Sequence, residues 1–258
     1  MSQNPEIVIS LNNVKKAFDD NVVFNGLDLD VHKGETITIM GGSGSGKSVC
    51  LKFLVGLLRA DSGDVNVFGE RVNDFNENDW IHTRRRVSML FQSGALFDSL
   101  NVRENIAYPL RVHFPDMDED KISETVANKL ELIGLPGIED MKPVDLSGGM
   151  RKRVGLARAI AMDPDVILWD EPTTGLDPIN TSRINGLIRR MQEVLKCTSV
   201  VVTHDMGTAF SVSDRIAFLY DKRLILTDTV EKVKQTDIPE VKNFIEGKFE
   251  GLYPEDEG

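Results

Sequence analysis

The sequence predicts an α/β fold in which a core of strands and helices is interrupted by a helical insertion. Three observations predict it. Runs rich in Val, Ile, Leu and Thr, typical of short strands, fill the first third of the chain and return after residue 163. A glycine-rich loop follows one of these runs directly and opens into an apolar helical pattern. Between residues 93 and 162, Val and Ile become sparse and apolar residues recur at helical spacing.

The residue pattern in the first third of the chain predicts three strands, followed by a loop and a helix. Strands are expected over Glu6–Val14, Val22–Val31 and Glu35–Met40, separated by Asp-Asp-Asn and Lys-Gly turns. The helix is expected over Lys47–Leu58, where apolar residues lie on most sides and indicate a largely buried element. Val87–Phe91 is a further short strand.

The rest of the chain predicts helices and then a return to strands. Apolar residues of Asp118–Ile133 are spaced so that they share one helix face. The other expected elements are helices over Ser147–Met162 and Thr181–Leu195, strands over Val166–Trp169 and Thr198–Thr203, and a hairpin of Arg215–Tyr220 with Arg223–Thr227. The simplest organisation is a core of residues 1–92 and 163–230, a helical subdomain of residues 93–162 and a C-terminal tail of residues 231–258.

Charge and cysteine content exclude several classes of protein. The 258 residues carry a net charge of −11 and include two cysteines, Cys50 and Cys197. A chain this acidic repels nucleic-acid phosphates, so we expect no nucleic-acid partner, and any phosphate must be bound by local geometry. Two scattered cysteines are too few for a disulfide framework and favour a reducing, intracellular compartment. No apolar run approaches the roughly 20 residues of a spanning helix, and no secretory signal is recognisable. We therefore expect a protein that works in solution or on a membrane surface provided by a partner.

The strongest motif is the pattern G-x-x-x-x-G-K-[ST] between an expected strand and an expected helix. It is formed by Gly41, Gly42, Ser43, Gly44, Ser45, Gly46, Lys47 and Ser48. Glycines let successive backbone N–H groups turn toward phosphates, and the helix N-terminus adds partial positive charge. Lys47 is expected to reach the β- and γ-phosphates, and the Ser48 hydroxyl to bind Mg²⁺. The loop predicts a nucleoside triphosphate site; the alternative is a glycine-rich turn that binds nothing.

Two carboxylates, Asp170 and Glu171, follow the expected strand Val166–Trp169. Asp170 suits water-mediated coordination of Mg²⁺, and Glu171 suits polarising an attacking water. Gln92 and His204 follow two other expected strands in the same way, although each alone also fits a structural role. Because ligands bind at the carboxyl edge of an open parallel sheet, we expect these side chains to converge with the glycine-rich loop on one phosphate site.

Six motifs together carry a resemblance that spans about residues 7–228. They are Gly41–Ser48, Gln92, Leu146–Met150, Asp170–Glu171, Gly175–Asp177 and His204. This set resembles that of ATP-binding cassette (ABC) transporter ATPases. The resemblance implies a P-loop NTPase fold of the ABC nucleotide-binding-domain type, with a RecA-like parallel core, an N-terminal antiparallel β subdomain and the inserted helical subdomain. It also implies ATP as the ligand, Mg²⁺ as the cofactor and ATP hydrolysis as the reaction.

The resemblance implies a role for each residue of these motifs and for one aromatic residue before them. Phe18 would stack on the adenine, although core packing at a strand end explains it equally well. Gln92 would contact Mg²⁺ and relay the nucleotide state to a membrane partner. Asp170 would bind the metal, Glu171 would be the catalytic base, and His204 would hold the γ-phosphate.

A second candidate anion site lies at the start of an expected helix, at Ser147, Gly148 and Gly149. An ordinary helix N-cap is the alternative explanation. In the family, two cassettes pair head to tail, and each ATP lies between one chain's loop and the other chain's cap. The resemblance therefore implies a second copy of the chain as a partner, with Asp177 at the interface. Met150 stands where the family more often has Gln.

Four segments are similar to those of the ATPases of Mla-type, MCE-associated lipid transport systems: Phe91–Val102, Tyr108–Arg111, Leu146–Met150 and Ile238–Gly251. This similarity implies an integral membrane permease, an MCE-domain protein and often a small STAS-domain protein as partners. It implies a peripheral location at the cytoplasmic face of the bacterial inner membrane and phospholipid as the cargo moved between inner and outer membranes.

The expected docking surface for the permease follows Gln92. Leu96, Phe97 and Leu100 would form an apolar patch there, or they would close the core of the helical subdomain.

Other functions remain open alternatives from the sequence. The chain could energise transport of another cargo, such as amino acids or lipoproteins. A non-transport ABC ATPase acting on ribosomes or DNA ends is less favoured, because the insertion has neither the length nor the sustained heptads of a coiled coil. A nucleotide-sensing scaffold would make Glu171 dispensable.

Overall fold

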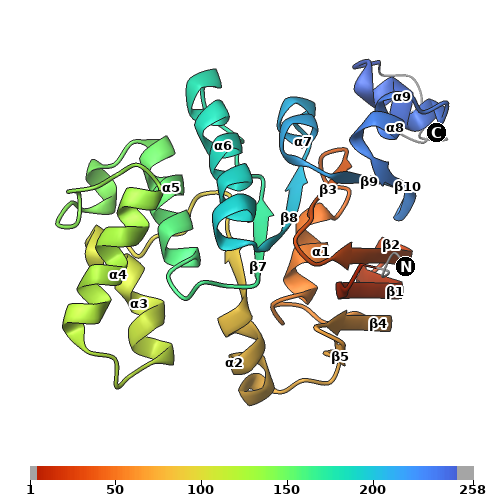
Figure 1. Cartoon of the computed structure of the whole chain (residues 1–258). Coiled ribbons are helices and arrows are strands. Elements are labelled where there is room, and N and C mark those ends of the chain that lie inside the picture. The colour runs from red at the N-terminus through yellow and green to blue at the C-terminus, as the bar shows by residue number, and fades with distance from the viewer. Residues whose placement is uncertain (1–4, 249–258) are drawn as a thin grey trace. The chain divides into compact units, whose positions relative to one another are not determined.

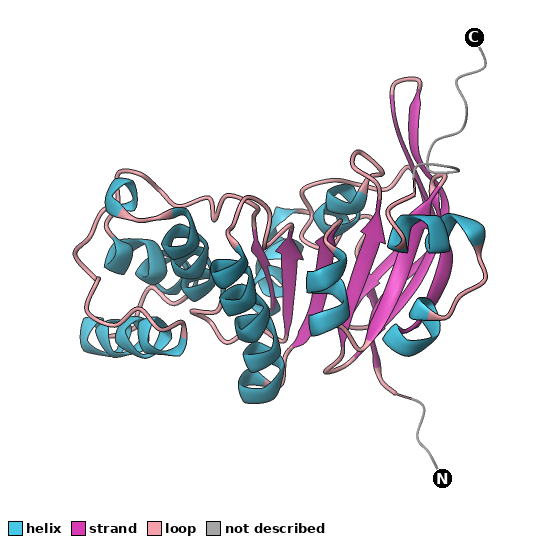
Figure 2. Cartoon of the chain, turned by 90° about the horizontal axis from the view of Figure 1, so that it is seen from above, coloured by secondary structure: helices cyan, strands magenta, loops and turns pink. Residues whose placement is uncertain are grey.

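A computed structural model describes residues 5–248 of the chain as a succession of strands and helices (Figure 2). Residue contacts divide the chain into two compact units. The first unit is Met1–Asp74 together with Val201–Gly258, and the second is Phe75–Val200. Within the described residues, no helix has the length and apolar character needed to cross a membrane.

An antiparallel sheet forms the N-terminal part of the first unit, as expected. Its strands are β1 (Ile7–Phe18), β2 (Asn21–His32), β4 (Ser62–Val67) and β5 (Glu70–Arg71), in the order β2-β1-β4-β5 (Figure 1). Strand β1 runs four residues beyond the expected end at Val14, because it pairs with β2 as far as Phe18 and absorbs several register shifts on the way.

The remaining strands of the first unit carry the glycine-rich loop. They are β3 (Thr36–Gly41), β9 (Arg215–Tyr220) and β10 (Arg223–Thr229). Their order in the sheet is β10-β9-β3, and β8 follows β3. Strand β8 (Thr198–Thr203) crosses the division between the units. Strand β3 is parallel to β9, with Gly41 opposite Leu219, and all its residues are buried. Its threonines and isoleucines are β-branched residues that favour strands, which is why the sequence located it well.

Helix α1 (Lys47–Phe53) follows the loop but is shorter than the expected Lys47–Leu58. Gly56, in the left-handed region at φ 69°, turns the chain back, and the N–H groups of Leu57 and Leu58 donate to the carbonyl of Lys52. A glycine in the left-handed region thus ends the helical segment. The apolar residues on both sides of Gly56 continue the helical pattern in the sequence, so the pattern predicted a longer helix.

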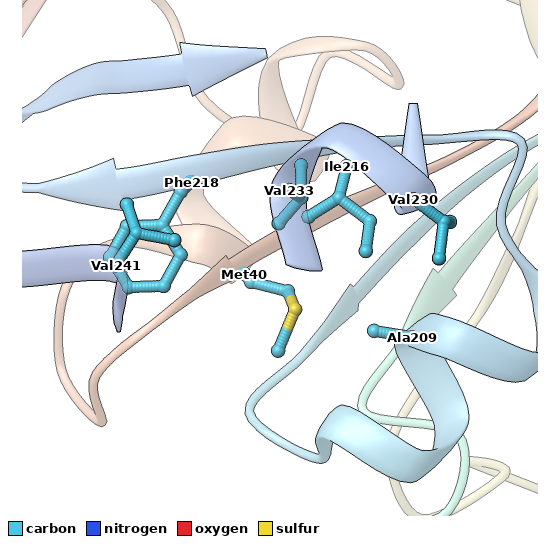
Figure 3. Close-up of a cluster of buried hydrophobic side chains, with 7 residues drawn as sticks. All are labelled: Met40, Ala209, Ile216, Phe218, Val230, Val233 and Val241. Carbon is cyan, nitrogen blue, oxygen red and sulfur yellow. The ribbon is translucent and has the colours of Figure 1, made fainter. Parts of the chain in front are cut away.

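The first unit also contains α7 (Met206–Val212), α8 (Val230–Lys234) and α9 (Pro239–Ile245), none of which the sequence pattern predicted. Figure 3 shows that α7, α8 and α9 cover β3 and β9 with an apolar cluster: Met40, Ala209, Ile216, Phe218, Val230, Val233 and Val241. The expected C-terminal tail is therefore packed as far as α9. Its residues 249–258, which include the end of the similar segment Ile238–Gly251, lie outside the described range.

The second unit contains most of the helices. Its elements are α2 (Glu77–Arg86), β6 (Val87–Leu90), α3 (Val102–His113), α4 (Glu119–Leu132), a 3₁₀ turn (Pro143–Asp145), α5 (Gly148–Ala159), β7 (Val166–Asp170) and α6 (Pro178–Leu195). The strand order is β8-β7-β6, and β6 runs parallel to β7 from Val87 opposite Val166 to Leu90 opposite Trp169. The carboxyl ends of β6 and β7 therefore meet at one edge.

Two helices of the second unit begin or end at other residues than the sequence predicted. Helix α5 stops at Ala159, three residues before the expected Met162, and Asp163 follows in the left-handed region at φ 50°. Helix α6 begins at Pro178, three residues before the expected Thr181, because Asp177 caps it and proline is well suited to the first helical position.

Candidate functional site

The glycine-rich loop leaves β3 at Gly41 and enters α1 at Lys47. The Lys47 side chain is buried, and its ammonium group donates to the carbonyl oxygens of Gly41 and Gly42 at 2.9 and 2.8 Å. These two bonds fold the lysine back over the loop. Helix α1 begins without a side-chain cap and without an acidic residue in its first turn, so its first N–H groups suit an anion.

Two of the loop glycines are required by close approaches in the first unit. A Cβ on Gly41 would lie 2.5 Å from the backbone oxygen of Leu219, and a Cβ on Gly46 would lie 2.4 Å from Val23. Gly44 has φ 77°, which favours glycine, and no atom lies within 4 Å of an added Cβ there. The loop is thus anchored at both ends on the strands and open at its middle.

Phe18 and His204 are the other predicted site residues of the first unit. Phe18 ends β1, is 42% exposed, and lies under the ammonium of Lys16 at 5.2 Å from its ring centre. This exposure shows that core packing was the wrong explanation for Phe18. His204 is exposed and follows β8 directly, and β8 is the neighbour of β3.

In the second unit, Asp170 and Glu171 lie at the end of β7. Asp170 is the last residue of the strand and is buried. Glu171 adopts the left-handed region at φ 47°, an uncommon conformation for a residue other than glycine. The hydroxyl of Thr174 donates to Glu171 Oε2 at 2.9 Å. The turn therefore aims the Glu171 carboxylate with both its backbone and a neighbouring side chain.

Gln92 lies just beyond β6, at the same edge as the end of β7, because these strands are parallel and in register. The segment after it packs on α5. Gly94 has φ 79°, and an added Cβ would lie 2.9 Å from the backbone oxygen of Arg151. Phe97 is 41% exposed, so it does not close the core, and its ring lies 4.8 Å from that of Tyr108.

Ser147 caps α5 by accepting a hydrogen bond from the Met150 N–H at 3.2 Å. The N-cap role expected as the alternative is thus present, and a hydroxyl that accepts still has a proton to donate. Gly149 is buried, and an added Cβ would lie 3.0 Å from the side chain of Asn180. Asn180 in turn donates from its backbone and side-chain amides to Asp177, which lowers the pKa of that carboxyl.

The predicted site residues are divided between the two units of the chain. The first unit holds Phe18, the loop Gly41–Ser48 and His204. The second unit holds Gln92, Ser147, Gly148, Gly149, Asp170, Glu171 and Asp177.

The sequence analysis missed Lys152 and Thr174, both of which hold the turn that carries Glu171. Lys152 lies on the buried side of α5, three residues after Gly149 and four before Leu156, so a lysine at a core position was the available signal. Arg158, also on α5, was missed as well; it donates to the carbonyls of Gly94 and Ala95 at 3.1 and 2.9 Å.

The donor set suits Mg²⁺ better than a metal held entirely by protein. Within residues 5–248, no three His, Cys, Asp or Glu side chains are grouped as metal ligands. Mg²⁺ usually keeps several waters and takes one or two carboxylates together with substrate phosphates. Asp170 offers a carboxylate and Gln92 an amide oxygen in the second unit, and Ser48 offers a hydroxyl in the first.

Comparisons with known proteins show to which family the chain belongs. The ABC transporter family pattern matches residues 24–174. The intermembrane phospholipid transport system ATP-binding protein MlaF of Haemophilus influenzae is 39% identical over 251 residues, which cover 97% of this chain and 94% of MlaF. The probable ribonucleotide transport ATP-binding protein mkl of Mycobacterium leprae is 38% identical over 242 residues, 94% of this chain and 70% of mkl. A solved structure, the dimeric ATP-binding cassette MJ0796 with ADP and Pi, has a TM-score of 0.80 and 30% identity, and covers 86% of this chain and 98% of its own.

The expected fold and reaction are confirmed by these matches, which extend over nearly the whole chain. The protein belongs to the ABC transporter family, and it binds and hydrolyses ATP.

Proposed function

We propose that this ATPase energises phospholipid transport between the inner and outer membranes of a bacterium. One observation carries the proposal: 39% identity with an intermembrane phospholipid transport ATP-binding protein over 94% of that protein's length. Similarity of this extent includes the segments outside the common ATPase motifs. The cargo itself is chosen by partner proteins, and this chain supplies the energy of ATP hydrolysis.

In this proposal, the first unit binds the nucleotide. The N–H groups of the loop and of α1 donate to the phosphates, and Lys47 moves from the carbonyls of Gly41 and Gly42 to the β- and γ-phosphates. Phe18 stacks on the adenine with its exposed ring. His204 would hold the γ-phosphate, and the Ser48 hydroxyl would be a ligand for Mg²⁺.

The second unit supplies the hydrolytic groups. Glu171 accepts a proton from the attacking water, and Thr174 fixes the orientation of its carboxylate. Asp170 and Gln92 are the residues of this unit that would hold Mg²⁺. When bound, Mg²⁺ neutralises charge that develops on the phosphate oxygens. The base is placed on a short turn directly after a buried strand, which limits its movement.

Two copies of the chain are proposed to pair head to tail. Ser147, Gly148 and Gly149 of one copy would bind the γ-phosphate of the ATP held by the other, with Asp177 at the interface. Ser147 and Gly148 are exposed at the start of α5, as such contact requires. The similar cassette MJ0796 is itself described as dimeric with ADP and Pi.

The other proposed partners are a membrane permease, an MCE-domain protein and, in many such systems, a small STAS-domain protein. The exposed rings of Phe97 and Tyr108, in contact with one another, offer an apolar surface for a permease helix. The chain would then lie at the cytoplasmic face of the inner membrane, held there by the permease.

A second candidate function is transport of another cargo. It is favoured by the 38% identity with mkl, a probable ribonucleotide transport protein. The two functions can be distinguished by purifying the assembled complex in detergent and identifying the proteins and small molecules bound to it by mass spectrometry. Phospholipid bound together with an integral permease supports the proposal; a permease that carries a nucleotide-like cargo and no phospholipid supports the alternative.

The proposed base is tested by Glu171→Gln, which keeps the shape of the side chain and removes its proton acceptor. We expect kcat for ATP to fall by about 10² to 10⁴, because general-base catalysis contributes that much. The affinity for ATP, measured by equilibrium binding, should stay within about twofold. Glu193→Gln on the exposed side of α6 is the matched control and should keep full activity. A Glu171→Gln protein that hydrolyses ATP at the normal rate would remove Glu171 from the role of base.

A further inference from the structure

The ammonium group of Lys152 is enclosed by the turn that carries Glu171. Lys152 is 6% exposed, and its Nζ donates to three backbone oxygens: those of Glu171 at 3.4 Å, Pro172 at 2.9 Å and Thr174 at 2.7 Å. An ammonium has three N–H donors, and three carbonyls are available to them. One side chain of α5 therefore binds three of the four carbonyls of residues 171–174 in the turn after β7, all except that of Thr173.

The turn needs such support because of its backbone. Glu171 has φ 47°, a sparsely populated conformation that persists only where the surroundings impose it. Its carbonyl accepts from the N–H of Thr174 at 3.3 Å as well as from Lys152, and its carboxylate accepts from the Thr174 hydroxyl. Lys152 and Thr174 together thus fix the backbone and the side chain of Glu171.

A positive charge at this position is unfavourable for folding unless its hydrogen bonds compensate for it. Burial lowers the pKa of Lys152, and the negative charge of Glu171 opposes that shift. Within the described part of the chain, Lys152 forms no ion pair at contact distance, and its partners are carbonyl oxygens. An apolar side chain would fill this place without a desolvated charge. What the lysine adds is a set of directed bonds to the turn.

We infer that Lys152 is a positioning residue for ATP hydrolysis, which acts by holding the Glu171 turn in its left-handed conformation. The inference rests on the proposed role of Glu171 as the base. Lys152 and the Ser147 cap belong to the same helix. The orientation of the base is therefore tied to the helix whose N-terminus we propose for the γ-phosphate of the other copy's ATP.

The test compares two buried lysines of the second unit. Lys152→Met keeps the length of the side chain and removes its donors. Lys129→Met is the control: Lys129 is 8% exposed and pairs with Asp163, away from the Glu171 turn. For Lys152→Met we expect kcat to fall by roughly 10- to 100-fold, since small misplacements of catalytic groups have effects of this size. KM for ATP should change by less than about twofold, because the first unit binds the nucleotide.

Lys152→Gln separates positioning from bulk stability. Its amide offers two N–H donors without a charge, so we expect kcat between those of the wild type and Lys152→Met. If Lys152→Met does not fold, Lys152→Gln alone decides: reduced kcat at unchanged KM supports the inference, and wild-type kcat overturns it. The inference is also overturned if Lys129→Met lowers kcat as much as Lys152→Met does. If Glu171→Gln remains active, the base assignment fails; if Glu171→Gln is inactive and Lys152→Met is fully active, only the inference about Lys152 fails.

Discussion

Cys50 lies on α1, two residues after Ser48, and is 1% exposed. Burial raises the pKa of its thiol from 9.0 to about 12. Cys197 is equally buried, and burial raises the pKa of its thiol to about 11. The thiolate is the reactive form, so both cysteines should be inert although one of them is close to the phosphate loop.

We therefore predict that a thiol reagent such as DTNB, at pH 8, labels neither cysteine of the folded protein and leaves ATPase activity intact. In denaturant the same reagent should label both cysteines of each chain. Asn128→Cys, at an exposed position of α4, provides a reactive control in the folded state. Rapid labelling of native Cys50 with loss of activity would contradict the burial of this thiol.

The raised pKa of Cys50 also predicts that the folded protein loses stability at alkaline pH. In the folded protein the pKa of the thiol is about 12, above its ordinary value of 9.0. The contribution of the thiol to folding stability is therefore complete below about pH 9 and is lost as the pH rises toward 12. Urea unfolding of the wild type and of Cys50→Ala at several pH values should show it. The wild type should lose stability more steeply above pH 9.

Among single residues, those that belong to a sequence motif could be predicted as site residues, and those that hold the motif residues in place could not. Glu171 follows a run of apolar residues, so its place at a strand end could be read from the sequence. Its left-handed backbone and the hydrogen bond from Thr174 depend on how the turn closes in space. Lys152 was missed among the several basic residues of α5, although its helical spacing from Gly149 and Leu156 placed it on the buried side; its carbonyl partners in the Glu171 turn depend on the fold.

Helix α5 connects the elements of the second unit through close backbone contacts. Gly155 lies against the segment after Gln92, where an added Cβ would be 2.8 Å from the carbonyl oxygen of Gly94. Arg158 then donates to the carbonyls of Gly94 and Ala95, and its guanidinium lies 5.2 Å from the ring centre of Phe97. The helix that begins at Ser147 thus also orders the segment that follows Gln92.

Gly155→Ala tests this contact. The added methyl group would meet backbone rather than a movable side chain, so we expect the free energy of unfolding to fall by about 1–3 kcal/mol. Gly186→Ala on α6 is the matched control, because nothing lies within 4 Å of its added Cβ. Alanine is the better helix former, so Gly186→Ala should stabilise by about 0.5–1 kcal/mol. Urea unfolding followed by circular dichroism measures both; equal effects of the two substitutions would contradict the close packing.

Strands that are buried along their whole length were predicted well, and short helices with few buried residues were not. Strands β3 and β7 are buried throughout: β7 is an apolar run that ends at Asp170, and β3 is rich in the β-branched residues that favour strands. Helix α2 buries only Trp80 and Thr83, so it shows almost no apolar periodicity. Its clearest local signal is the capping box of Asn76 and Asp79, which helical periodicity does not detect.

At the scale of the whole molecule, a net charge of −11 requires that anions be bound by local donors. The loop, the uncapped start of α1 and Lys47 provide such donors in the first unit. The same charge disfavours direct adsorption to an anionic membrane surface. The proposed location at a membrane therefore depends on contacts with a permease rather than on attraction to lipid.

The proposed pairing of two copies can be tested by Ser147→Arg in the Glu171→Gln protein, which should bind ATP without consuming it. We expect size-exclusion chromatography with ATP and Mg²⁺ to give a dimer for Glu171→Gln and a monomer for the double variant. The arginine would occupy the place of a phosphate at the exposed start of α5, and the Met150 N–H would lose its cap. Asn128→Arg, on the exposed side of α4, adds the same charge as a control and should leave the dimer intact. Binding of ATP itself should persist in every variant, because the loop of the first unit is unchanged. A dimer that forms normally with Ser147→Arg would mean that the cap does not contact the other copy's nucleotide, and Ser147 would then act only as the N-cap seen in the structure.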